Sequence, residues 1–178
     1  PGKGSLMTVK TGKQGTETLT DDVSISGADL AQPETSPNRL LFVTEPLKEP
    51  LHISGTPSIT IRASSDKPAV NLSVWMVILP WTQGTRNIND NIINRGWADL
   101  RNFKSLEKSK ALVPGKFYEM TFDLEPDDQI VPAGKQIGLM IFSSDKEFTL
   151  WPEPGTKLTV DLDQTTITIP VVGGLVKF

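Results

Sequence analysis

The segment Pro57-Ser-Ile-Thr-Ile-Arg-Ala-Ser64 alternates between apolar and polar side chains. In an extended chain successive side chains point to opposite faces, so these two kinds of residue separate onto two faces. A period of two with one polar face predicts a strand of an antiparallel sheet that has one side in water. The apolar face holds Ile59, Ile61 and Ala63, and the polar face holds Thr60, Arg62 and Ser64.

Further short apolar runs precede and follow this segment along the chain. Among them fall 14 glycines and 14 prolines in 178 residues, which is typical of an all-β domain with many turns. We therefore expect about seven or eight strands in a two-sheet antiparallel sandwich, most simply a jelly roll. The further runs are Leu40–Thr44, Asn71–Leu79, Phe117–Leu124, Gln136–Ser143, Lys157–Leu162 and Thr166–Val171.

The first 38 residues differ from the rest, because they are rich in Gly, Thr and Ser and hold only scattered apolar residues. We interpret residues 1–38 as a lead-in segment from a missing upstream domain, with one short strand near Val23–Ile25, and residues 39–178 as the sandwich domain. The best helix candidate is Trp97–Lys110, where apolar residues recur at helical spacing.

Two of the runs, Asn71–Leu79 and Gln136–Ser143, are apolar on both faces. A strand of this kind must be covered on both sides, whereas a sandwich covers only one. Either the lead-in or the segment 81–113 covers the second face, or another domain packs there. Under the second alternative the interdomain-interface candidates are Trp75, Val77, Met140 and Phe142.

Composition excludes several classes of partner and chemistry. With 18 basic and 21 acidic side chains the net charge is -3, so no basic nucleic-acid footprint covers the surface. No apolar stretch approaches the roughly 20 residues of a membrane span, and we expect neither a nucleic-acid nor a membrane partner. The absence of cysteine excludes disulfides and a cysteine nucleophile. A domain without cysteine is compatible with a location in the cytoplasm or outside the cell, and we slightly favour the cytoplasm.

Catalytic and metal-binding motifs are also missing. The sequence has no Gly-x-Ser-x-Gly elbow, no phosphate-binding loop and a single histidine, His52, which we interpret as a surface or turn residue. We interpret the acids as solvated turn residues and expect no metal and no cofactor. These acids are Asp21, Asp22, Asp127, Asp128, Asp161 and Asp163. The chain alone therefore carries no predicted catalytic site.

Tryptophan offers one alternative function. Trp81 and Trp151 lie beside prolines in predicted loops, where exposed rings could stack on a pyranose ring. Core or interface packing is the more common role of tryptophan. The alternative is a free-standing carbohydrate-binding module with these two rings as its platform.

A set of strand-and-turn strings occurs in one order along the chain. It begins with Arg39-Leu-Leu-Phe-Val-Thr-Glu-Pro-Leu47 and ends with Ile169-Pro-Val-Val-Gly-Gly174. This ordered set resembles the C-terminal, non-catalytic jelly-roll domain, galactose-binding-domain-like in fold, of Xaa-Pro dipeptidyl-peptidases and related cocaine-esterase-type hydrolases. The strings between are Ile53–Asp66, Asn71–Leu79, Asn94–Arg101, Pro114-Gly115 before Phe117–Leu124, Val131–Leu139, Ser143–Asp145 and Pro154–Lys157.

The resemblance implies a division of labour. An upstream α/β-hydrolase domain of the same polypeptide would carry the Ser, Asp and His of a serine-type peptidase, or of an esterase or acylase. This chain would pack on that domain, wall the active-site cleft and support assembly, including contacts of a homo-oligomer. The resemblance assigns no catalytic residue to this chain, and His52 has no counterpart in the family's triad.

Overall fold

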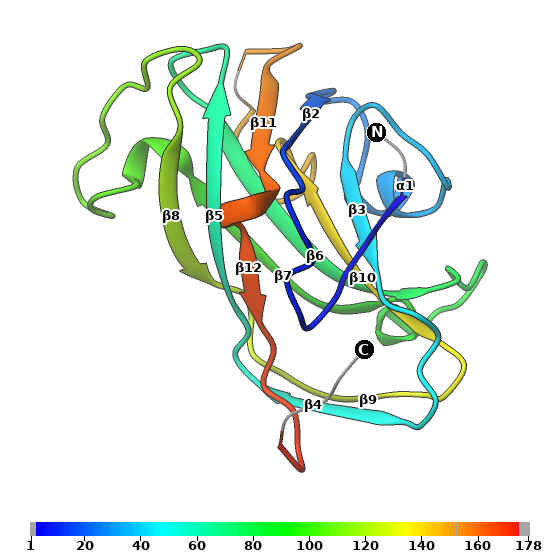
Figure 1. Ribbon diagram of the computed structural model, residues 1–178. Helices are drawn as coiled ribbons and strands as arrows, with labels where there is room; N and C mark the ends of the chain where they lie inside the picture. Colours follow the sequence, from blue (N-terminus) through cyan, green and yellow to red (C-terminus); the bar gives the residue numbers. More distant parts are fainter. Residues whose placement is uncertain (1–2, 152, 175–178) are drawn as a thin grey trace.

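The computed structural model describes residues 3–151 and 153–174, and within these ranges it is a β-sandwich with little helix (Figure 1). One sheet has the order β1-β3-β10-β6-β7, and its strands are antiparallel except for the parallel pair β1–β3. These strands are β1 (Lys3–Ser5), β3 (Leu40–Val43), β10 (Gln136–Phe142), β6 (Asn71–Leu79) and β7 (Ile92–Asp99). The expected antiparallel sandwich is confirmed.

The second sheet is centred on β5, which pairs with β8, β11 and β12, while β2 adds to β11. A third, two-stranded sheet of β4 and β9 lies across the bottom of the view in Figure 1. The strands are β2 (Thr16–Thr20), β4 (Leu51–Gly55), β5 (Ser58–Ser65), β8 (Tyr118–Asp123), β9 (Asp127–Val131), β11 (Lys157–Asp161) and β12 (Thr166–Thr168). The helical elements are α1 (Gly27–Ala31) and the 3₁₀ turns η1 (Ile88–Asp90), η2 (Leu100–Asn102) and η3 (Leu162–Gln164).

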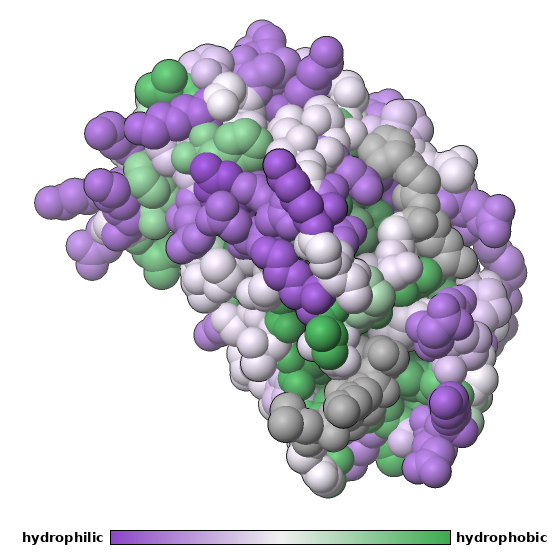
Figure 2. Space-filling view, in the orientation of Figure 1, coloured by the Kyte–Doolittle hydropathy of each residue, from purple (hydrophilic) through white to green (hydrophobic). Residues whose placement is uncertain are grey.

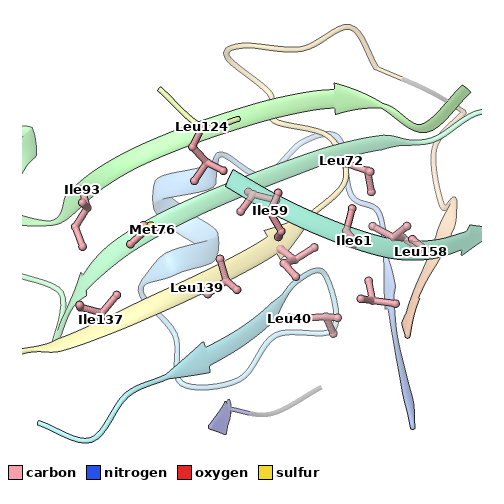
Figure 3. Close-up of a cluster of buried hydrophobic side chains, with 14 of the residues drawn as sticks. Leu40, Ile59, Ile61, Leu72, Met76, Ile93, Leu124, Ile137, Leu139 and Leu158 are labelled. Carbon is pink, nitrogen blue, oxygen red and sulfur yellow. The ribbon is translucent and has the colours of Figure 1, made fainter. Parts of the chain in front are cut away.

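The main core fills the space between the two large sheets, as the alternation of β5 predicts. Ile59 and Ile61 of β5 are fully buried and face β6 and β10, whose inward residues include Met76 and Leu139 (Figure 3). The polar residues of β5 point away from this core, and Thr60 and Thr121 form a cross-strand hydrogen bond of 2.8 Å between their hydroxyls. Burial of one face per strand therefore sets the pairing register.

The second apolar face of β6 and β10 carries a separate cluster, which we call the outer cluster. It is covered by α1 of the lead-in, and its buried members are Leu30, Ala31, Leu41, Trp75, Val77, Leu79, Ile92, Met140 and Phe142. Ser26 caps the helix, since its Oγ accepts a hydrogen bond from the Asp29 N–H. The buried Arg39 holds the other end, where its Nε donates to the Leu30 carbonyl at 3.0 Å. This face is thus covered from within the chain, by α1 of the lead-in and by Trp81 of the segment 81–113, which packs against the cluster.

The lead-in is part of the sandwich. Its β1 pairs with β3 in one sheet and its β2 pairs with β11 in the other, so the strand pairing shows no division at residue 38. The strand expected at Val23–Ile25 is wrong: Ile25 N–H donates to the Asp22 carbonyl in a turn, and the strand lies earlier, at β2.

The helix expected at Trp97–Lys110 is also wrong. Trp97 lies in β7, opposite Ser73 of β6, and only the single 3₁₀ turn η2 follows. The apolar spacing that suggests a helix arises because Leu100 is buried in the core and Phe103 packs against it from a turn. Pairing with β6 therefore outweighs the local helical pattern.

The surface in this view is mainly hydrophilic. Figure 2 shows purple side chains gathered at the upper left, where Figure 1 places the loop that follows η2. That loop exposes four lysines, namely Lys104, Lys108, Lys110 and Lys116. Among the helices of the described ranges, none has the length and apolar character needed to cross a membrane.

Candidate functional site

The four interface candidates from the sequence lie together but are not exposed. Trp75, Val77, Met140 and Phe142 are at most 2% exposed and belong to the outer cluster under α1. Another domain therefore cannot contact these side chains directly while α1 is in place. Any contact on this side would be made by α1 and the loops around it.

His52 lies at the surface, as predicted, and its Nε2 is hydrogen-bonded to a carboxylate oxygen of Asp128 across the β4–β9 sheet. This hydrogen bond from His52 lowers the pKa of Asp128 below its usual range. In residues 3–151 and 153–174 no group of three or more His, Cys, Asp or Glu side chains could hold a metal ion.

Two of the acids interpreted as solvated are buried. Asp21 is 5% exposed and accepts hydrogen bonds from the N–H and the hydroxyl of Ser144, at 2.9 and 2.7 Å. Its burial raises the pKa of the carboxyl, against the lowering effect of these bonds. Asp161 is 8% exposed and pairs with Arg62. Both acids therefore tie strands together, a role that spacing alone does not show.

The two tryptophans of the carbohydrate alternative have different surroundings. Trp81 is half-buried and packs against the outer cluster, whereas Trp151 is 57% exposed. Trp151 therefore offers the more accessible ring of the two.

The structure assembles a cluster that the sequence does not predict, which we call the arginine–tryptophan cluster. Antiparallel pairing of β6 and β7 places Arg95 opposite Trp75, with Trp97 two residues further along the same face. The indole N–H groups of Trp75 and Trp97 both donate to Oδ2 of Asp145, each at 2.9 Å. Asp145 is fully buried, so one carboxylate oxygen fixes both rings.

The Arg95 guanidinium completes this cluster. It lies 4.6 Å from the ring centre of Phe148 and about 5.6 Å from that of Trp75. The Phe148 ring stacks on Trp97, with ring centres 5.1 Å apart. Guanidinium–ring and ring–ring contacts of this kind hold the side chains in a defined arrangement. The loop between β10 and β11 is thereby bound to the face of β6 and β7.

This loop presents three large apolar side chains to solvent, which we call the apolar tip: Phe148, Leu150 and Trp151, at 48%, 93% and 57% exposure. The backbone beneath it is fixed. The Asp145 N–H and carbonyl both bond the Thr149 hydroxyl, at 3.0 and 3.1 Å, and Asn71 donates to the Leu150 carbonyl. The tip is therefore a preformed exposed apolar surface, the kind that marks interaction sites.

Sequence reasoning identified Trp151 but missed Phe148 and Leu150 as surface residues. The available signal was Phe-Thr-Leu-Trp, with three large apolar residues in four positions, between charged residues and a Pro-rich turn. The partners that fix the loop come from β6 and β7, far away in sequence, so the loop's arrangement could not be derived from this string.

Comparison with known proteins places the chain among peptidase domains. Residues 2–174 match the model of the X-Pro dipeptidyl-peptidase C-terminal non-catalytic domain. A putative Xaa-Pro dipeptidyl-peptidase of Rhodopirellula baltica is 54% identical over 177 residues, which cover 99% of this chain and 28% of that protein. One from Bacillus cereus is 40% identical over 154 residues, 85% of this chain and 25% of that protein.

Solved structures show the same fold at low sequence identity. An alpha-amino acid ester hydrolase superposes with a TM-score of 0.70 at 18% identity, covering 91% of this chain and 33% of its own. An aminopeptidase from a marine sediment Thaumarchaeota archaeon gives a TM-score of 0.69 at 19% identity, over 90% of this chain and 34% of its own. The chain thus spans about a quarter to a third of the proteins it matches.

Proposed function

The chain belongs to the family of X-Pro dipeptidyl-peptidase C-terminal non-catalytic domains, and from this we propose the activity of the whole polypeptide. The whole polypeptide is a serine-type peptidase that removes Xaa-Pro dipeptides from the N-termini of peptides. The α/β-hydrolase domain outside this chain supplies the activated serine and the oxyanion hole. The 178 residues of this chain contribute binding surface and no reacting group.

The observation that carries the proposed role of this chain is the apolar tip. Leu150 is 93% exposed on a loop that Asp145, Thr149 and Asn71 hold in place. Full burial of one large apolar side chain stabilises an interface by about 1.5–3 kcal/mol before ordering costs. Because the loop is already ordered, little of that gain is lost on binding. We propose that the tip packs on the catalytic domain of the same polypeptide and helps to wall its cleft.

Paired substitutions of two exposed leucines in the full-length polypeptide test this role. Leu150→Asp places a charge in the proposed interface, whereas Leu106→Asp changes a leucine that is 85% exposed on the loop after η2. We expect Leu150→Asp to lower kcat/KM for an Xaa-Pro chromogenic peptide by at least tenfold and Leu106→Asp to leave it within about twofold. Equal activity of both variants would contradict docking through the tip.

The carbohydrate alternative makes a different prediction for Trp151. Stacking of a sugar on this ring would change its fluorescence on titration with oligosaccharides, whereas docking on a protein domain leaves it unchanged. A saturable change in the full-length polypeptide, lost in Trp151→Ala, would favour the binding module over the docking role.

A further inference from the structure

Arg95 of the arginine–tryptophan cluster forms no hydrogen bond with any other residue that the structure describes. Its Nε is buried and lies 3.6 Å from Oε2 of Glu125, which is too far for a hydrogen bond. The two terminal nitrogens donate to no acceptor in the described part of the chain, and they are not among its buried atoms. Because the side chain is 20% exposed, these terminal N–H groups are open to a partner from outside.

The other arginines that are at least partly buried all have acceptors within the chain. Arg39 donates to backbone carbonyls, and Arg62 pairs with Asp161. Arg101 donates from Nε and from a terminal nitrogen to one carboxylate oxygen, at 2.9 and 2.6 Å. A partly buried guanidinium is thus normally satisfied in this fold, and Arg95 is the exception among the described residues.

Aromatic rings hold the Arg95 guanidinium without using its donors. The guanidinium carbon lies 4.6 Å from the ring centre of Phe148 and 5.7 Å from that of Trp97. Attraction of the charge to these rings restricts the side chain. The carboxylate of Asp145 accepts the two indole N–H groups through Oδ2, while its Oδ1 has no hydrogen-bond partner in the described ranges. Asp145 therefore does not satisfy Arg95 either.

We infer that the Arg95 guanidinium binds the carboxylate of an Asp or Glu on the catalytic domain of the same polypeptide. Phe148 links this site to the apolar tip, because its ring contacts Arg95 and is also one of the three exposed side chains of the tip. Docking of the tip would therefore remove water from Arg95 as well. A charge that loses water without a counter-charge is costly, and the planar guanidinium matches the two oxygens of a carboxylate.

Two observations favour a carboxylate of this polypeptide as the partner. The free N–H groups lie beside a preformed apolar surface, and an arginine among aromatic side chains is typical of the centre of a protein–protein interface. Two-thirds or more of each matched protein lies outside the part that aligns with this chain, so a large surface is tethered at high effective concentration. The inference rests on the proposed function, because it assumes that the tip docks on the catalytic domain.

Hydrogen exchange read by mass spectrometry on the full-length polypeptide tests the inference. Arg95→Met keeps an unbranched apolar side chain but removes the charge and the N–H donors. We expect one segment outside the 178 residues, containing an Asp or Glu, to exchange at least about tenfold faster, as loss of charged hydrogen bonds implies. Arg95→Lys keeps the charge without the planar fork, so it should give a smaller increase in the same segment.

Arg62→Met is the matched control. The Arg62 guanidinium also lies over a ring, 4.7 Å from the ring centre of Phe117, but it is bonded to Asp161 within this chain. Its loss should speed exchange around β5 and β11 and leave the outside segment unchanged. A similar increase outside the chain in Arg62→Met and Arg95→Met would reflect a general loss of stability and would overturn the inference.

A double-mutant cycle then identifies the partner. Each Asp of the affected segment is changed to Asn and each Glu to Gln, one at a time. One of these changes should reproduce the effect of Arg95→Met and add nothing when the two are combined, because both remove the same ion pair. If every acid of the segment acts additively with Arg95→Met, the guanidinium binds none of them and the inference is overturned.

Comparison with the tip variant separates the inference from the proposed function. If Leu150→Asp speeds exchange outside the chain and neither Arg95→Met nor Arg95→Lys does, docking stands and Arg95 only packs against its rings. If none of the three variants alters exchange outside the chain, both docking and the inference fail.

Discussion

Gly27 of α1 lies directly on the ring of Trp75: a Cβ built on the glycine would come within 2.4 Å of Cζ2 and 2.6 Å of Cη2 of the indole. The lead-in helix and the central strand β6 are therefore in contact at a point where no side chain fits between them. This contact explains how a segment with few apolar residues covers the second apolar face of the sheet.

Gly27→Ala is expected to destabilise the domain by about 1–3 kcal/mol, because the buried ring cannot move away without disturbing the outer cluster. Urea unfolding measures the change. In a Trp75→Phe background, whose ring is smaller, the cost of Gly27→Ala should fall clearly. If Gly27→Ala leaves the free energy of unfolding of the otherwise wild-type domain unchanged, α1 does not pack on this ring.

Asp145→Ala is expected to lower the free energy of unfolding by about 3 kcal/mol, because two indole N–H groups lose their shared acceptor. Asp145→Asn keeps a carbonyl oxygen at that place and should cost much less. Tryptophan fluorescence and thermal unfolding of both variants check this order. An equal loss in both variants would mean that the charge of Asp145, rather than its oxygen, holds the two rings.

Arg39→Lys tests how α1 is held. The guanidinium donates from Nε to the Leu30 carbonyl and from a terminal nitrogen to the Glu34 carbonyl, at 3.0 and 3.2 Å, and burial lowers its pKa. Lysine keeps the charge but cannot reproduce this fork, so we expect a loss of about 2 kcal/mol and faster amide exchange in α1. Unchanged exchange in α1 would contradict this role.

Asp163 should make stability depend on pH. Its carboxylate accepts the N–H groups of Gln14 and Gly15, each at 3.0 Å, and these bonds hold its pKa below the usual range. A carboxyl whose folded pKa is lowered stabilises the protein above its unfolded pKa, and this contribution disappears as the pH falls through the folded pKa. The stability difference between wild type and Asp163→Asn should therefore be present at neutral pH and vanish in acid. A difference that is constant with pH would exclude this linkage.

Much of the sandwich follows from alternation along single strands. β5, β8 and β11 lie where the alternating runs predict them, because each packs one face on the core, and β6 and β10 lie where the runs that are apolar on both faces predict them, because both of their faces are buried. The lead-in strand β2 was missed because only Leu19 of its five residues is buried. β7 was missed because its outward Arg95 and Trp97 hide the strand period behind a helix-like spacing.

The site was less predictable than the fold, for a physical reason. Asp145 and Trp75 are 70 residues apart, and only the register of β6 against β10 brings the loop after β10 to the indole. Asn94 is an ordinary strand residue in the sequence, and only the placement of its neighbours shows that its carboxamide has no hydrogen-bond partner among the described residues. The local sequence pattern contains neither the long-range strand register nor the set of hydrogen-bond partners around a side chain.

Hydroxyl-radical footprinting of Trp151 tests docking of the tip most directly. In this chain alone the ring is 57% exposed, and Met7, at 48%, serves as an internal reference of similar exposure. In the full-length polypeptide we expect the catalytic domain to bury the ring of Trp151. The oxidation rate of Trp151, relative to that of Met7, should then fall by at least about fivefold, because a side chain removed from solvent is shielded from the radical. An equal relative rate in the full-length polypeptide and in the chain alone would contradict the account.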